Sequence, residues 1–513
     1  NEGYAAVREL LKDYDTFISE SDADNSDTLA NEMTIVLAIA AVIIIAVLLL
    51  TSQTYAEVPV LLITFVAGMI LNKGTNFIFG EISFVSNSVT AVLQLALSID
   101  YAIILIHHYS EERGMYDQHE AVVRALARSI PEISSSSLTT ISGLMALMFM
   151  QFKIGFDMGM CLIKSIFYSL LCVFTLMPCL LMLFGKYIDK THHKSLLPDI
   201  SGLGNVVYKL RMIVPPIFAG VLILGYILSS KCLYTYNANS SKTSRQNETQ
   251  IAKETIEKYF GQRNLAALVF PTGDYDKEKQ LIKELEQHNE VKSITALSSV
   301  EAKDGYVLTD KLTPRQFSEL ADIDIDTTKL LYGLYAADNE DYSKLISNLN
   351  DFGVPLIDMF TFVHDLKQDG YVHLDDDLAK DIDDLYSQLN TARVQLAGDK
   401  YSRMLVYLNL PIEGAETFAF IDTVHSIASK YYDEYYFVGD STSCYDLKNS
   451  FATDNIVVSV LSILFVIIIL FFTFKNAGLP VLLILVIQGS VWINFSASYV
   501  THSNMFFLSY LIV

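Results

Sequence analysis

Apolar segments long enough to approach or cross a bilayer recur along this chain. A transmembrane helix needs about 20 apolar residues to span a hydrocarbon core of about 30 Å. The segments of this kind, the last of them incomplete, lie at 34–52, 58–72, 84–106, 136–151, 155–184, 212–230, 456–474, 479–499 and 504–513. This pattern predicts a polytopic α-helical membrane protein.

A polar region of more than 200 residues separates the segments at 212–230 and 456–474. Its hydrophobic periodicity predicts two strand–helix–strand units, which fit an α+β ferredoxin-like sandwich. The expected elements are strands at 265–270 and 291–297 with a helix at 276–288, and strands at 403–410 and 435–438 with a helix at 415–431. Residues 310–397 between the two units are expected to form a helical insertion.

Two acidic clusters in the insertion, 322–326 and 375–377, could indicate calcium binding. Neither has the spacing of a calcium-binding loop. Helix starts and solvated faces explain them better, because acidic side chains favour the first turn of a helix. Thr313 followed by Pro314 likewise predicts a helix start, with Thr as the N-cap.

The charged residues are unevenly distributed along the chain. The formal net charge is −22, and acidic residues outnumber basic ones between Lys231 and Asp446. This excess argues against nucleic acid as a partner. Lys and Arg gather in the loops after residue 107 and between 184 and 212, which we place in the cytoplasm. The large domain would then be extracytoplasmic, on a protein of the cell (plasma) membrane.

Five cysteines are present, and two of them flank the polar region. Cys232 and Cys444 could form a disulfide, although two free thiols are the favoured interpretation.

The chain contains an internal repeat at a shift of 421 residues. The sequence Pro-Val-Leu-Leu-Ile at 59–63 recurs at 480–484, and Gly68 corresponds to Gly489. The hydropathy profile stays in register around these matches, as in transporters built from duplicated halves. Since residue 1 is Asn and an apolar segment stops at Val513, we expect the chain to be a fragment of a longer protein. The counterpart of the segment at 84–106 would then continue beyond Val513.

Asp100 is the strongest functional candidate. It lies within the otherwise uncharged segment at 84–106, where a carboxylate costs several kcal/mol. A structural polar group and a proton or ion site both remain possible from this position alone.

Lys164 is a possible ion-pair partner for Asp100, because both would lie at middle depth. The alternative is that Lys164 extends to the outer interface. Ser98, Thr139 and Thr140 could line a polar path, although such residues also promote close helix packing in membranes. His107 and His108 follow Asp100 and could serve proton uptake or contact lipid headgroups.

The motif Ser-Ile-Asp-Tyr at 98–101 resembles the fourth-helix signature of the resistance–nodulation–division (RND) superfamily, above all its "mycobacterial membrane protein large" (MMPL) branch. Leu-Thr-Thr-Ile-Ser-Gly-Leu at 138–144, Leu-Met-Pro-Cys-Leu-Leu at 176–181 and Phe-Val-Gly-Asp-Ser at 437–441 also resemble that branch.

The resemblance implies a twelve-helix pump with two outer porter domains, of which this chain holds about 8–9 helices. The implied parts are the tail of a first outer domain (1–33), helices two to six (34–185), a cytoplasmic linker (186–211), helix seven (212–230), the second outer domain (231–453), and helices eight, nine and part of ten (454–513). In such pumps the helix-four aspartate takes up and releases protons. Asp100 and Tyr101 inherit that role.

We therefore predict a proton-driven exporter of lipids, amphiphiles or hydrophobic drugs. A sterol-sensing, Patched-like receptor and a protein-secretion accessory are the alternatives. An enzyme is not expected, nor a cofactor or bound metal, since no nucleophile–base pair, metal-spaced cluster or phosphate-binding loop stands out. Substrate identity and oligomeric state, a homo-oligomer included, are left open.

Overall fold

The structure is a computed structural model that describes the chain apart from residues 1–5, 8, 15, 18–25, 53, 192–200, 238–247, 303, 340–348, 370–375, 477 and 508–513. The chain divides into two compact units. The first comprises residues 1–16, 20–244 and 447–513, and the second comprises residues 17–19 and 245–446.

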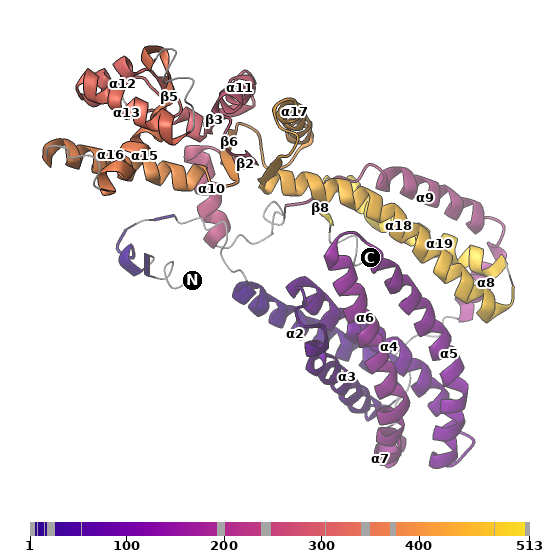
Figure 1. The fold of residues 1–513 in the computed structure, drawn as a ribbon. Coiled ribbons are helices and arrows are strands. Elements are labelled where there is room, and N and C mark those ends of the chain that lie inside the picture. Colours follow the sequence, from indigo (N-terminus) through magenta and orange to yellow (C-terminus); the bar gives the residue numbers. More distant parts are fainter. Residues whose placement is uncertain are drawn as a thin grey trace. The chain divides into compact units, whose positions relative to one another are not determined.

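The first half of the membrane unit is a helical bundle, drawn in the indigo to purple part of Figure 1. Helix α4 packs against α3, α5 and α6, so it lies at the centre of the bundle. A π-helical turn, η2 (Cys172–Leu176), joins α6 to α7 in one continuous helical stretch. The helices are α2 (Ser26–Thr51), α3 (Glu57–Gly74), α4 (Phe84–Arg113), α5 (Gln118–Leu147), α6 (Lys153–Leu171) and α7 (Met177–Lys190).

The remaining apolar helices of this unit are α9 (Val214–Ser229), α18 (Asp440–Phe474) and α19 (Gly478–Val500), with α9 packed along α19. A short helix, α8 (Ser201–Lys209), precedes α9, and β1 (Tyr234–Thr235) pairs with β8 (Met505–Phe506). Within the described residues, five helical stretches are long and apolar enough to cross a membrane. They are Glu57–Phe79, Phe84–Arg113, Lys153–Lys190, Asp440–Phe474 and Gly478–Val500. The apolar segment expected at 504–513 lies largely outside the described residues.

The repeat has a structural counterpart. Helix α3 begins at Glu57 and α19 begins at Gly478, which differ by the same 421 residues as the sequence match. Gly68 and Gly489 are both buried where neighbouring helices approach closely: a Cβ on Gly489 would meet the side chain of Leu222. A small residue at such a position lets two membrane helices pack at short distance.

The second unit is built on a four-stranded antiparallel sheet of order β3-β6-β2-β7. Its two strand–helix–strand units lie where the sequence predicted them. They are β2 (Asn264–Pro271), α11 (Tyr275–Leu285) and β3 (Val291–Thr295), then β6 (Tyr401–Leu408), α17 (Ala415–Tyr431) and β7 (Tyr436–Gly439).

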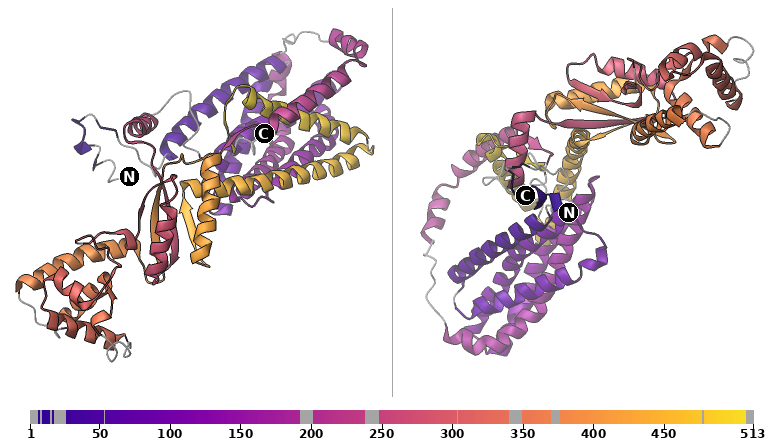
Figure 2. Two further views of the ribbon diagram at one scale, coloured as in Figure 1. Left: turned by 90° about the horizontal axis from the view of Figure 1, so that it is seen from above. Right: turned by 90° about the vertical axis from the view of Figure 1, so that its left-hand side faces the viewer.

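Alternating burial along β2 and β6 places one face of the sheet in the core, where Leu268 pairs with Met404 and Ala266 pairs with Val406. Helices α11 and α17 pack against each other and cover the sheet on one side (Figure 2). The short 3-10 turn η4 (Leu297–Ser299) follows β3, and helix α10 (Glu248–Phe260) precedes β2.

The insertion between the two strand–helix–strand units is helical, as predicted, and has a hydrophobic core of its own. Thr313 caps its first helix through a reciprocal capping box with Gln316. Asp324 caps the next helix by accepting backbone N–H bonds from Asp326 and Thr327. These contacts confirm that the cluster at 322–326 marks a helix start; the cluster at 375–377 begins outside the described residues. The elements are α12 (Pro314–Ala321), α13 (Ile325–Asp338), α15 (Leu356–Gln368) and α16 (Asp376–Leu396), with β4 (Lys311–Leu312) paired to β5 (Val354–Pro355).

Cys232 and Cys444 are free thiols, both buried. The favoured interpretation of two free thiols therefore holds in this structure.

Glu278 on α11 is a buried carboxylate in this soluble unit, and burial raises its pKa despite a backbone N–H bond from Ser298. A raised folded-state pKa means that the folded unit binds more protons than the unfolded chain, so its stability falls as pH rises above the unfolded pKa. Glu278→Gln is expected to remove this pH dependence and to stabilise the unit at neutral pH. Hydrogen exchange of the β2 amides at two pH values measures the effect, with the exposed Glu286→Gln as control; a wild-type pH dependence in Glu278→Gln would contradict it.

Candidate functional site

Asp100 lies on the face of α4 that the described residues leave exposed. Ala96, His107 and Glu111 share this face at helical spacing and are also exposed. The other faces of α4 pack against α2, α3, α5 and α6. The carboxylate therefore sits midway along a helix of membrane-spanning length, on its exposed side.

Tyr101 points in another direction, into the bundle core, where its side chain is buried. Its hydroxyl lies near Thr140 of α5 but makes no well-formed hydrogen bond among the described residues. Thr139 and Thr140 donate their own hydroxyls to backbone carbonyls one turn earlier, at 3.0 and 3.2 Å. Of the residues predicted to line a polar path, Thr140 therefore lies near Tyr101.

Ser98 belongs to a different cluster. Its hydroxyl donates to the Gln94 carbonyl at 2.6 Å and lies 2.7 Å from the Ser169 hydroxyl of α6. Both residues are buried. Ser98 therefore faces α6, while Asp100, two residues further along the helix, faces away from it.

Lys164 is not paired with Asp100 in the described part of the chain. Its ammonium donates to the Asn72 carbonyl at 2.9 Å, to the Thr75 hydroxyl at 3.3 Å and to Asn76 Oδ1 at 2.5 Å. It also lies 5.0 Å from the centre of the Phe79 ring. The lysine extends along its stem to the polar end of α3, which corresponds to the alternative expected for this residue.

The depth of these groups explains why the ion pair does not form. Asn76, a partner of Lys164, also donates to Asn87 on α4 at 3.1 Å. Asn87 precedes Asp100 by 13 residues, or about 20 Å at 1.5 Å per residue. The ammonium is therefore far from the carboxylate along the helix axis.

Sequence reasoning missed the polar side chains that connect these helices. Gln94 Oε1 accepts a hydrogen bond from Asn72 Nδ2 at 2.9 Å, and Gln94 Nε2 approaches the Ser169 hydroxyl at 3.4 Å. A signal was present, because Ser86, Thr90, Gln94 and Ser98 recur every four residues on α4. This spacing places them on one face.

His107, His108 and Glu111 gather at the far end of α4, where atoms able to bind a metal lie within 4.8 Å of one another. His108 Nε2 also lies 3.0 Å from Glu132 of α5. Arg128 shares Glu111 with the histidines at 3.5 Å and also lies 2.9 Å from Glu112. This end of α4 is thus a network of titratable groups, of which His107 and Glu111 are exposed and Glu112 is buried.

The fold and this site define a multi-pass helical membrane protein with a carboxylate embedded in a spanning helix. Residues 19–198, which include Asp100 and its neighbours, match the model of the MMPL family. The motifs at 98–101, 138–144 and 176–181 lie within the matched residues, so the match agrees with the resemblance seen in this part of the chain.

Two proteins of Streptomyces coelicolor are similar to part of the chain. Membrane protein ActII-3 is 33% identical over 101 residues, which are 20% of this chain and 14% of that protein. Membrane protein SCO6666 is 32% identical over 109 residues, which are 21% of this chain and 16% of that protein. The similarity thus spans less than a fifth of either relative.

Proposed function

We propose that this protein is a proton-motive-force-driven transporter of the MMPL type, exporting lipids, amphiphiles or hydrophobic drugs across the plasma membrane. The observation that carries the proposal is the position of Asp100. It is a carboxylate at the middle of a spanning helix, in the region that matches the family. Intramembrane ionisable residues of this kind commonly mark proton pathways.

In this proposal Asp100 takes up and releases the transported proton, and Tyr101 supplies a hydroxyl beside it. The exposed Asp100 face of α4 would meet the equivalent helix of the second half, as the internal repeat implies. Lys164 acts away from the carboxylate, at the end of the bundle formed by residues 75–83.

The second unit would act as an extracytoplasmic porter domain of ferredoxin-like type, corresponding to residues 231–453. Its four-stranded order supports this assignment, because two interlocked strand–helix–strand units produce it. Its acidic character argues against nucleic acid as its main partner.

The test separates a pump from a sterol-sensing receptor. The protein is reconstituted into vesicles made from the host's total membrane lipid, so that endogenous amphiphiles are present. Imposing a proton gradient is expected to drive proton flux, read by an internal pH dye, together with export of lipid to the opposite leaflet. A protonophore should abolish the export. Lipid export that persists unchanged without a gradient would contradict proton coupling.

A further inference from the structure

The inward face of α4 carries a line of buried polar side chains. Ser86, Thr90, Gln94 and Ser98 follow one another at four-residue intervals, and none is more than 3% exposed. From first to last they extend about 18 Å, at 1.5 Å per residue. This is more than half of a hydrocarbon core of about 30 Å.

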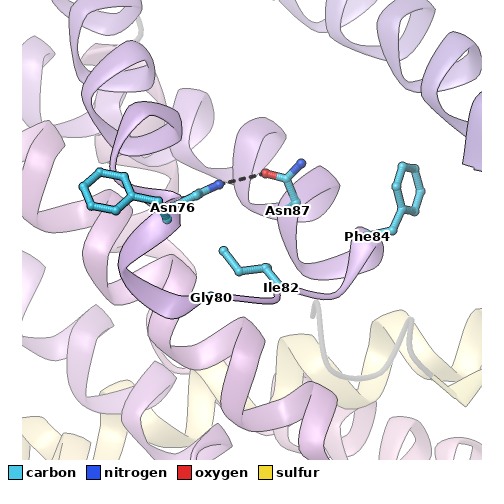
Figure 3. Close-up of a pocket in the computed structure, with 6 residues that line it drawn as sticks. Asn76, Gly80, Ile82, Phe84 and Asn87 are labelled. Atoms are coloured by element: carbon cyan, nitrogen blue, oxygen red, sulfur yellow. Dashed lines mark hydrogen bonds between the residues drawn. The ribbon is translucent and has the colours of Figure 1, made fainter.

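Hydrogen bonds connect this line to the end of the bundle at residues 75–83. Asn87 lies at the rim of a pocket of about 400 Å³ and accepts a hydrogen bond from Asn76 (Figure 3). Asn76 in turn accepts from Lys164, which also donates to the Asn72 carbonyl. The Asn72 side chain then donates to Gln94. Lys164 and Asn72 thus link the pocket to Gln94, with the Asn72 backbone carbonyl accepting from Lys164 and its side-chain amide donating to Gln94.

The other end of the line approaches the Asp-Tyr pair. Gln94 Nε2 approaches the Ser169 hydroxyl, which lies 2.7 Å from the hydroxyl of Ser98. Tyr101 follows Ser98 by three residues and therefore lies on the same side of the helix. We call the residues Asn72, Ser86, Thr90, Gln94, Ser98, Tyr101 and Ser169 the α4 seam.

Several polar atoms of the α4 seam lack a partner among the described residues, although they are buried. They are the hydroxyls of Ser86, Thr90 and Tyr101 and the Oδ1 of Asn72. Ser and Thr in a helix usually satisfy themselves by donating to the carbonyl four residues earlier. Ser98 and Ser169 do so, at 2.6 and 2.9 Å, but Ser86 and Thr90 do not.

A buried polar group that is left unpaired destabilises the folded protein, because it has lost its hydrogen bonds to water without replacement. Several such atoms in one line are therefore better explained by bound water, which pairs with groups that the protein leaves unsatisfied. A chain of water and hydroxyl groups also lets protons pass between neighbouring oxygens.

We infer that the α4 seam is a hydrated proton conduit, leading from the pocket at residues 76–87 through Ser86, Thr90 and Gln94 to Tyr101, the residue that follows Asp100 in the chain. This inference rests on the proposed function of Asp100. It assigns the route to the interior of one half of the membrane unit, between α3, α4 and α6. The exposed Asp100 face of α4 is a different surface.

The first experiment measures whether the seam contains water. Thr90→Cys and Ala91→Cys are introduced separately into the full protein in membranes, and modification by a small methanethiosulfonate is quantified at each site by mass spectrometry. Ala91 is a matched control, because it is buried at the same depth but on another side of α4. Only a thiolate reacts, and a thiolate forms in a hydrated site. We expect Thr90→Cys to react at least about tenfold faster than Ala91→Cys, since burial in apolar surroundings suppresses the thiolate.

The second experiment measures proton flux in the same vesicles for Thr90→Val, which keeps the side-chain shape without the hydroxyl. We expect a severalfold loss that Thr90→Ser restores, with a shifted pH profile. Equal labelling of the two cysteines, or normal flux in Thr90→Val, would overturn the inference. A failure of the proposed function can be told apart from a failure of this inference. If the proposed function were wrong, Asp100→Asn would retain gradient-driven transport, whatever the results for the Thr90 variants.

Discussion

Replacing Asp100 by Asn is expected to abolish gradient-driven transport while leaving expression and folding intact. The amide has nearly the shape of the carboxylate but cannot exchange a proton. Asp100 makes no hydrogen bond or ion pair with the described residues, and its side chain is exposed. The substitution therefore removes the charge change without removing a structural contact.

The size of the loss follows from the energy that one proton delivers. A charge moving through 100 mV supplies about 2.3 kcal/mol, which corresponds to roughly a fiftyfold difference in attainable substrate gradient. Export into the opposite leaflet of the reconstituted vesicles measures it. Asp100→Glu is the matched control and should retain partial activity, because it keeps a titratable carboxyl. Full transport by Asp100→Asn at normal protein levels would rule out the proposed role.

Removing the carboxylate of Asp454 is expected to loosen the junction between α5 and α6. Asp454 on α18 is only 1% exposed, and its two oxygens accept backbone N–H bonds from Gln151 and Phe152 at 3.0 and 3.2 Å. Phe152 is the residue from which α6 begins. Hydrogen bonds to charged groups contribute about 1.5–3 kcal/mol each, and the two N–H groups would be left unpaired.

Hydrogen exchange reads this effect directly, because the Gln151 and Phe152 amides are the donors. In Asp454→Ala we expect their protection to fall by about a hundredfold, equivalent to roughly 2.7 kcal/mol of local stability. Asp454→Asn should give an intermediate loss, since it keeps one acceptor oxygen. Asp446→Ala, at an exposed position of the same helix, serves as the control. Unchanged exchange at both amides in Asp454→Ala would show that the contact does not hold the junction.

Local pattern was sufficient for the elements of both units. The strands predicted at 265–270 and 403–410 correspond to β2 and β6, and the helix predicted at 415–431 corresponds to α17 with the same bounds. Capping residues were equally informative, as Thr313 and Asp324 show. These signals are short-range, because they depend on neighbours within one or two turns of the backbone.

Partners between helices were less accessible to sequence reasoning. Asp100 and Lys164 are both charged and both lie within apolar segments, so their sequence positions suggested the same depth in the membrane. The prediction of an ion pair between them on this basis was wrong. The long stem of Lys164 carries its charge to the end of α3, toward Asn72 and Asn76. The role of Asp454 was not foreseen either, since the groups that donate to it are backbone N–H groups 302 and 303 residues away.

The sequence by itself determined the membrane class, the repeat, the elements of the second unit and the Asp-Tyr motif, because each depends on composition or periodicity along the chain. Only the tertiary structure decided that Lys164 serves the end of the bundle and that Gln94 joins α3 to α6. It also decided that the seam and the Asp100 face are separate sides of α4. Such contacts depend on how helices rotate and pack against one another, and sequence spacing within a single helix does not fix that rotation.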